Sequence, residues 1–213
     1  MRPLVITWPA SNTTAVAALQ TLAAPGKLTL NGSLSNPNNI PGVVFQGITR
    51  NITLTSLNNL SAATFTINGV LNNAPISETI AGPNHNTVTS VNFYDAITSI
   101  SVNAAVTGVS VGTGLAGATR WISANYNLNR AHYSVQVVVT GTIQYDFGVT
   151  LDDPNVIADP DQFGIISAMN DATTTQFASF NNPIAYASVT IDSAGTDGTG
   201  SLVVTFLQQG ISS

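Results

Sequence analysis

The amino-acid sequence predicts an all-β protein with two antiparallel β-sandwich domains, Ig-like or jelly-roll-like, and an extended N-terminal segment. Apolar and polar residues alternate along several short segments, which places them on opposite faces of a sheet. The polar positions favour Thr, whose branched side chain suits a pleated surface. Asn, Gly and Pro separate the segments, as is typical of the turns in antiparallel sandwiches.

The clearest alternation covers Thr142–Leu151 and predicts a strand with one apolar face, made of Ile143, Tyr145, Phe147, Val149 and Leu151. Val135–Val139 alternates in the same way, apart from Val138. Gly141 between the two runs predicts a bulge or bend in one long ribbon, Tyr133–Leu151, rather than a tight hairpin. Shorter strands are expected at Asn51–Ser56, Thr64–Asn68, Ile76–Ile80, Val88–Phe93, Thr98–Val102, Ser188–Ile191 and Leu202–Leu207.

Little helix is expected in this chain. The Ala- and Leu-rich segment Thr14–Ala23 predicts one helix, capped by Ser11 or Asn12 and ended by Pro25-Gly26. A second short helical turn is expected near Phe163–Met169.

The glycine-rich segment Gly112–Gly117 separates two strand-rich blocks and is interpreted as an interdomain linker. Residues 47–115 then form an Ig-like sandwich, and residues 116–213 form a second sandwich built on the long ribbon. Residues 1–46 contain too few strands to fold alone. They are expected to add edge strands (Leu4–Trp8, Leu28–Leu30) to one sandwich or to extend as an arm. A single jelly roll is the alternative architecture.

The composition excludes several functional classes. Hydrophobic residues make up 44% of the chain, which is enough for a core and excludes disorder driven by charge. Charged residues make up only 7%, against about 25% in ordinary domains. Five basic residues and a net charge of -5 argue against a nucleic-acid partner. The absence of Cys removes thiolate sites and disulfides, and no apolar run is long enough to predict a membrane span.

Two segments match catalytic or nucleotide-binding motifs. Gly108–Gly112 fits the nucleophile elbow G-x-S-x-G, with Ser110 as nucleophile. The valines around Ser110 alternate as in a strand, however, and no acid lies between Ser110 and His132. Gly112–Gly117 fits G-x-G-x-x-G, but an extended segment follows it instead of the helix that a pyrophosphate site needs. Strand and linker are therefore the preferred interpretations.

Half of the ten acidic residues lie in one stretch, at Asp146, Asp152, Asp153, Asp159 and Asp161. Such a cluster leaves calcium binding open, although no EF-hand spacing is present and Asp before Pro is common in turns. Asp152 and Asp153 are poor partners for glycoside hydrolysis because adjacent residues on a strand point to opposite faces. We expect no catalytic, cofactor-binding or metal-binding residues and therefore no enzyme.

The remaining polar residues of interest are few. His85 is expected in a solvated loop, and His132 at the start of the long ribbon is no metal site by itself. Arg120-Trp121 and Arg130 are candidates for an interface, where Arg and aromatic residues are enriched, although packing of Trp121 in the interior is equally compatible.

Several segments together resemble a pattern that recurs in virion proteins of tailed bacteriophages. The first half carries it at Ala63–Ile67, Ile76–Pro83, Val88–Ser90, Ile97–Val102 and Val109–Gly112. The second half carries it at Val137–Thr142, Gln144-Tyr145, Thr150–Pro154 and Gly200–Gly210. The sequence departs from the pattern after Asp-Asp-Pro, where Asp161-Gln162-Phe163 stands in place of a loop with Trp and His.

The resemblance implies a structural component of the virion, assembled in the host cytoplasm. We expect a homo-oligomeric capsid decoration or cement protein that binds the major capsid protein lattice through strand edges and its N-terminal segment. A tail or fibre component is the nearest alternative. A glycan-binding adhesin is an alternative of another class, with Trp8, Trp121 and Tyr126 stacking on sugars and Asp152, Asp153 or a calcium ion binding their hydroxyls. A hydrolase using Ser110 is a third.

Overall fold

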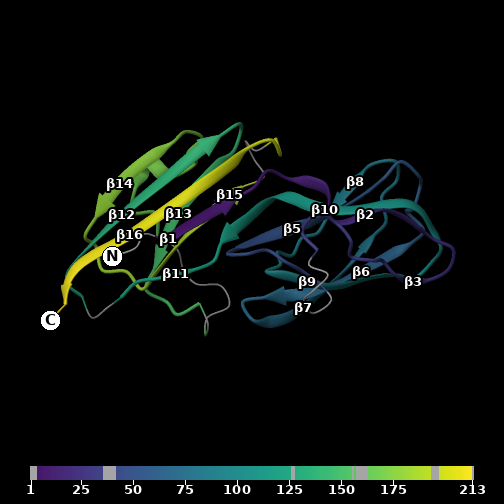
Figure 1. The fold of residues 1–213 in the computed structure, drawn as a ribbon, viewed down its shortest axis with the longest axis horizontal. Helices are drawn as coiled ribbons and strands as arrows, with labels where there is room; N and C mark the ends of the chain where they lie inside the picture. The colour runs from purple at the N-terminus through teal and green to yellow at the C-terminus, as the bar shows by residue number, and fades with distance from the viewer. Residues whose placement is uncertain are drawn as a thin grey trace. The chain divides into compact units, whose positions relative to one another are not determined.

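The computed structural model describes residues 4–35, 42–125, 128–154, 156, 163–192 and 197–212. As predicted, the fold is all-β: sixteen strands and one short 3-10 helix, η1 (Ser167–Met169), make up its regular structure in these ranges. The chain divides into two compact units (Figure 1). Unit 1 consists of Met1–Ala10 and Leu115–Ser213, and unit 2 consists of Ser11–Gly114. No helix in these ranges is long and apolar enough to cross a bilayer.

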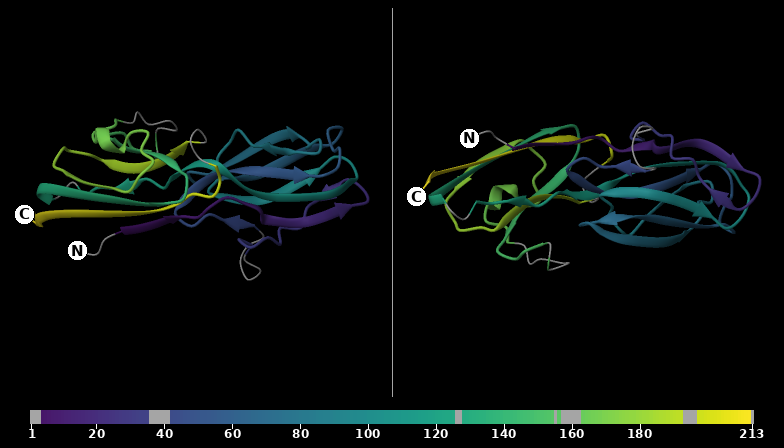
Figure 2. Two further views of the ribbon diagram at one scale, coloured as in Figure 1. Left: turned by 90° about the horizontal axis from the view of Figure 1, so that it is seen from above. Right: turned by 60° about the horizontal axis from the view of Figure 1, so that its bottom comes forward.

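Unit 1 contains two antiparallel sheets. The first has the order β1-β16-β12-β14, and in Figures 1 and 2 the N-terminal strand β1 runs beside the C-terminal strand β16. In the second, β15 pairs with β13, with β11 and with the end of β10. The strands are β1 (Leu4–Trp8), β10 (Val106–Thr119), β11 (Ile122–Ser123), β12 (Leu128–Thr140), β13 (Gln144–Thr150), β14 (Gln176–Phe180), β15 (Tyr186–Asp192) and β16 (Ser201–Ser212).

Aromatic rings join the two sheets of unit 1. Tyr133 on β12 stacks on Phe180 of β14 at 5.0 Å and on Phe206 of β16 at 5.9 Å. Phe147, from β13 in the second sheet, lies 5.9 Å from Phe180. Offset aromatic pairs at these distances add about 0.5–1.5 kcal/mol each beyond their buried area. β1 is an edge strand of the first sheet, and its Trp8 side chain is 1% exposed.

Unit 2 is a second pair of antiparallel sheets. In one, β6 lies between β7 and β9, and β9 also pairs with β3 and β4. In the other, β5 lies between β8 and the first part of β10, which also pairs with β2. The strands are β2 (Asn12–Leu22), β3 (Gly26–Lys27), β4 (Val43–Val44), β5 (Ile48–Ser56), β6 (Thr64–Leu71), β7 (Ala74–Ala81), β8 (Thr87–Thr89) and β9 (Ala96–Val102). Buried side chains from both sheets form the core, among them Ile52, Leu54, Phe65, Ile67, Ile97, Ile100, Val109 and Val111.

The helix expected at Thr14–Ala23 is wrong, because this segment is strand β2. The Asn12 side chain, expected as a helix cap, instead accepts hydrogen bonds from the backbone N–H and the hydroxyl of Thr14, 2.9 and 3.0 Å away. This local turn competes with a helix start. Pairing with β10 then provides hydrogen-bond partners for the backbone of β2, so tertiary contacts override the helical preference of Ala and Leu. The helical turn expected near Phe163–Met169 is confirmed in its last three residues, as η1.

The long ribbon Tyr133–Leu151 is also wrong, because it is two strands in different sheets. Gly141 has φ +77°, a left-handed conformation that suits Gly, and it ends β12 so that the chain crosses to β13 in the second sheet. The alternation predicted over Thr142–Leu151 is confirmed by four buried side chains, those of Ile143 just before β13 and of Tyr145, Phe147 and Val149 within it. Leu151 breaks it, since it lies beyond β13 and is 68% exposed.

The domain limits differ from those expected at the N-terminal end. Residues 1–46 do not act as one segment: β1 belongs to unit 1, whereas β2, β3 and β4 belong to unit 2. The edge strand Leu4–Trp8 is confirmed, but the strand near Leu28–Leu30 is Gly26–Lys27 instead. The units meet in the chain at Gly114 and Leu115, inside β10, so Gly112–Gly117 is not a linker. Unit 2 is therefore inserted between the first strand of unit 1 and its remainder.

Candidate interaction surface

The residues of the two sequence motifs lie inside one strand. Ser110 is in the middle of β10 and 5% exposed, whereas a nucleophile elbow presents its Ser at a strand-to-helix turn. β10 continues to Thr119 past the last glycine of the G-x-G-x-x-G match, so no helix N-terminus faces that segment. The glycines instead allow close packing. A Cβ on Gly114 would overlap the side-chain oxygen of Asn51 on β5.

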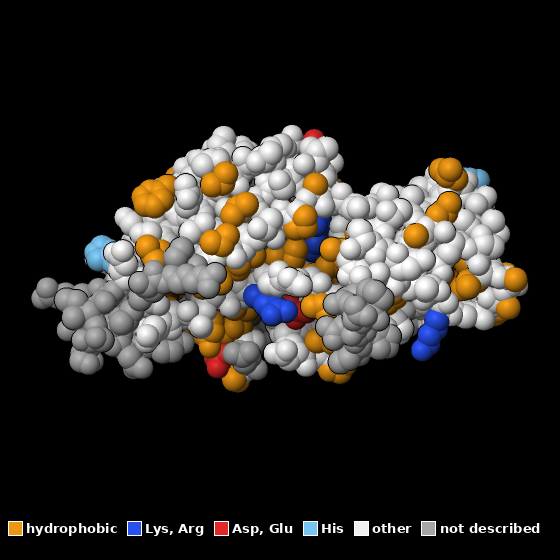
Figure 3. Space-filling model, viewed as in Figure 1, with side chains coloured by type: hydrophobic (Ala, Val, Ile, Leu, Met, Phe, Trp, Pro, Cys, Tyr) orange, Lys and Arg blue, Asp and Glu red, His pale blue; other side chains and the backbone are white. Residues whose placement is uncertain are grey.

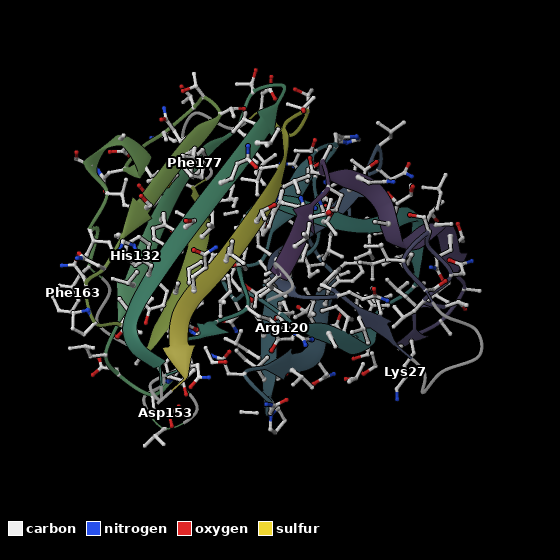
Figure 4. The ribbon with its side chains drawn as sticks, turned by 60° about the vertical axis from the view of Figure 1, so that its left-hand side comes forward. Lys27, Arg120, His132, Asp153, Phe163 and Phe177 are labelled. Atoms are coloured by element: carbon white, nitrogen blue, oxygen red, sulfur yellow. The ribbon has the colours of Figure 1, made fainter. Side chains whose placement is uncertain are left out.

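The two histidines lie in different units. His85 is exposed in a loop of unit 2 with φ +55°, and its Nδ1 is 2.6 Å from the carbonyl oxygen of Leu57. This matches the expected loop position. His132 is exposed on β12 in unit 1 (Figure 4). Ser110 belongs to unit 2, as His85 does, and its side chain is buried.

Two of the clustered acidic residues accept hydrogen bonds, one from a backbone N–H and one from a Tyr hydroxyl. Asp146 Oδ1 accepts the N–H of Asp171 at 2.6 Å, and Asp153 Oδ1 accepts the hydroxyl of Tyr186 at 3.3 Å. Asp171 has φ +53°, so Asp146 holds a tight turn. In the described part of the chain, no three His, Asp or Glu side chains gather as metal ligands would. Asp159 and Asp161 lie outside the described residues.

The aromatic residues considered for sugar stacking do not form an exposed group. Trp8 is 1% exposed and packs inside unit 1, so it cannot stack on a glycan. Trp121 is half-buried beside the exposed Arg120, and Tyr126 and the side chain of Arg130 lie outside what the structure describes. The glycan-binding alternative therefore loses Trp8, one of its three aromatic side chains.

One buried cation was missed at the sequence level. Arg50 on β5 is 1% exposed, and its Nη2 donates to the carbonyl oxygen of Gly114 on β10 at 2.5 Å. Burial lowers its pKa to about 10. Arg50 alternates with Ile48, Ile52 and Leu54, which would have signalled an inward position. It joins two strands of unit 2 and has a structural role.

The feature of unit 1 best suited to binding is the outer face of its first sheet. Strand register and alternating burial place exposed and half-buried side chains on this face. We call ten of them, in its central part, the outer sheet face; the pairs His132–Gln209 and Thr140–Ser201 lie beyond them on the same face. The ten are Val5, Thr7, Ser134, Gln136, Val138, Phe177, Ser179, Val203, Thr205 and Leu207. Val5, Thr205, Gln136 and Phe177 stand directly opposite one another across the four strands. The irregular Val138, which broke the alternation in the sequence, is one of its apolar members.

The outer sheet face is uncharged, and half of its ten side chains are apolar. Phe177 is 68%, Val5 54% and Val138 38% exposed. Hydroxyl and amide groups separate them, and the only charged residue in the sequences of the four strands is Arg130, near the start of β12. Figure 4 labels Phe177 and His132 on this sheet, and in Figure 3 few charged side chains are seen among the described residues on the side in view. A neutral face of this kind can be covered without desolvating an unpaired charge.

No protein-family model matches the chain, and no curated protein matches it at a significant level.

Proposed function

We propose that the protein is a structural component of a tailed-phage virion, most specifically a capsid decoration protein that binds copies of itself and the major capsid protein. In this proposal it acts by binding and has no enzymatic activity. The resemblance of its strand segments to virion proteins of tailed bacteriophages supports the assignment to virion structural proteins. The outer sheet face, broad and free of charged side chains on its described residues, is the observation that carries the binding role.

The chemistry of this face suits repeated protein contacts. Each copy that packs on it buries exposed apolar groups such as Phe177, and burial of apolar area contributes about 25 cal/mol per Å². The hydroxyl and amide groups between them provide hydrogen bonds at the rim. A low net charge also limits repulsion between many identical copies.

The two edge strands of the same sheet supply a second mode of contact. β1 and β14 each pair with a neighbour on one side only among the described strands. Open edges are templates for pairing with another chain, which soluble proteins usually block with charges or Pro. β1 and β14 contain neither. Strand addition at such an edge is therefore open to a partner.

The experiment that tests the proposal is direct location of the protein. Antibodies against the chain are applied to purified phage particles that carry it, and bound antibody is imaged by electron microscopy. We expect regular labelling of the head. Labelling of the tail or fibres would favour the alternative virion position, and absence of the chain from purified particles would refute the proposal.

A pair of variants tests the surface itself. Phe177→Asp places a charge in the outer sheet face, and we expect it to reduce occupancy on capsids at least tenfold. Phe163→Asp is the matched control, because Phe163 is similarly exposed, 57%, but lies outside this face. Equal occupancy of the two variants would show that another surface makes the contact.

A further inference from the structure

The first strand of unit 1 is separated from the rest of its unit by the whole of unit 2. β1 ends at Trp8, unit 2 begins at Ser11, and the chain returns to unit 1 only at Leu115. No short stretch of chain therefore connects β1 to the rest of its sheet, and backbone pairing and side-chain packing hold it there. A segment joined to its site in this way can in principle occupy the same site on another copy.

The site of β1 is well formed. Five residues of β1 pair antiparallel with β16, from Leu4 opposite Phe206 to Trp8 opposite Leu202. Ile6 and Trp8 point into the sandwich, with 8% and 1% of their surfaces exposed. Backbone pairing and two buried anchors are the elements by which proteins recognise an added strand.

The connection between β1 and β2 is short and contains a proline. Only Pro9, Ala10 and Ser11 lie between the two strands. Pro9 fixes its own φ and favours an extended conformation at Trp8. A short hinge favours exchange of an element between copies, because a longer hinge would let the element fold back more easily.

We propose that β1 is an exchangeable strand: in assemblies, β1 of one copy pairs with β16 of a second copy. This inference rests on the self-association in the proposed function. Exchange preserves every β1–β16 contact, so the two arrangements differ only in the hinge and in concentration. A tethered segment has an effective concentration on the order of 1 mM, so exchange becomes competitive where copies are crowded, as on a shell.

Cysteine pairs report the exchange directly, because the chain contains no Cys. Val5→Cys in one copy and Thr205→Cys in another become directly opposite strand partners when β1 of the first pairs with β16 of the second. Directly opposite residues have Cα atoms about 4.5–5.5 Å apart, within the range of a disulfide. The variants are mixed at about 1 mM, unfolded and refolded together, and oxidised. The matched control is Val5→Cys with Ser179→Cys, since Ser179 is on β14, which does not pair with β1.

We expect at least tenfold more disulfide-linked dimer from the Val5/Thr205 mixture than from the control. Insertion of four Gly-Ser residues after Ala10 should lower this yield at least threefold. The single-chain double variant V5C/T205C should form an intrachain disulfide, which checks that the pair is competent. An intrachain disulfide without excess linked dimer in the mixture would overturn the exchange.

Size-exclusion chromatography of the unmodified chain separates this outcome from failure of the proposed function. Oligomers without β1–β16 crosslinks would leave self-association standing and overturn strand exchange alone. Crosslinks in a chain that is absent from purified particles would support exchange and refute the virion proposal.

Discussion

Replacement of Trp8 by Ala tests whether β1 is part of the core of unit 1 or an arm. Trp8 is 1% exposed and stands opposite Leu202 in the pairing with β16. A buried Trp removes about 150–250 Å² from water, which at 25 cal/mol per Å² corresponds to about 4–6 kcal/mol. Because an extended unfolded reference overstates this area, the lower range from large-to-small substitutions, about 3–5 kcal/mol, is the better expectation.

The assay uses the position of the two Trp residues. Trp8 and Trp121 both belong to unit 1, so tryptophan fluorescence during urea denaturation follows this unit alone, and Trp121 remains as reporter in Trp8→Ala. With a slope of about 1–3 kcal/mol per M urea, a loss of about 3–5 kcal/mol should lower the midpoint by about 1–5 M. Val5→Ala is the control on the same strand, because Val5 is 54% exposed and should cost less than about 1 kcal/mol.

A result in which Trp8→Ala and Val5→Ala destabilise unit 1 equally would refute the reasoning. It would mean that β1 contributes little to the core in solution and behaves as the arm considered from the sequence. Deletion of residues 1–12 would test the N-terminal segment as an arm that binds the particle. Such a deletion removes the Trp8 anchor, so any loss of particle binding must be compared with the stability of unit 1.

Three further predictions follow from the two cores. Burial raises the pKa of Tyr145 from 10.0 to about 12. The buried neutral phenol therefore contributes its full stabilising free energy below pH 10, and this contribution is lost as the pH rises from 10 toward 12. The free-energy difference between wild type and Tyr145→Phe should therefore fall by up to about 2–3 kcal/mol over this interval in denaturation curves, and a constant difference would contradict the assignment. Gly114→Ala should destabilise unit 2 by about 1–3 kcal/mol in thermal unfolding, because its Cβ overlaps Asn51, whereas Gly26→Ala, which meets an atom no nearer than 3.9 Å, should cost little. Residues 11–114 expressed alone should fold cooperatively, since unit 2 is continuous in the sequence and has its own core. Residues 115–213 alone lack β1 and should be less stable than unit 1 in the full chain. A 115–213 fragment as stable as unit 1 would contradict the role of β1.

Sequence periodicity predicted the individual strands well where one face is buried. Leu4–Trp8 matches its strand end to end, and the buried set of β13 was anticipated from alternation. Periodicity failed at Thr14–Ala23, where Ala-rich composition indicated a helix. It also failed at Gly141, because a left-handed glycine has the same sequence signature whether it bends a strand or ends it. The one sign of the outer sheet face in the sequence was Val138, an apolar residue at a position where the alternation expects a polar one.

The all-β class, the low charge and the absence of thiol chemistry follow from the sequence alone, because alternation, turn residues and composition are local properties of a chain. The pairing of the first strand with the last and the insertion of unit 2 were decided only by the tertiary structure. So were the burial of Trp8 and the grouping of neutral side chains on the outer sheet face. The physical reason is that each depends on which distant segments become neighbours in a sheet, and a period of two says which face a residue takes without saying which strand lies beside it.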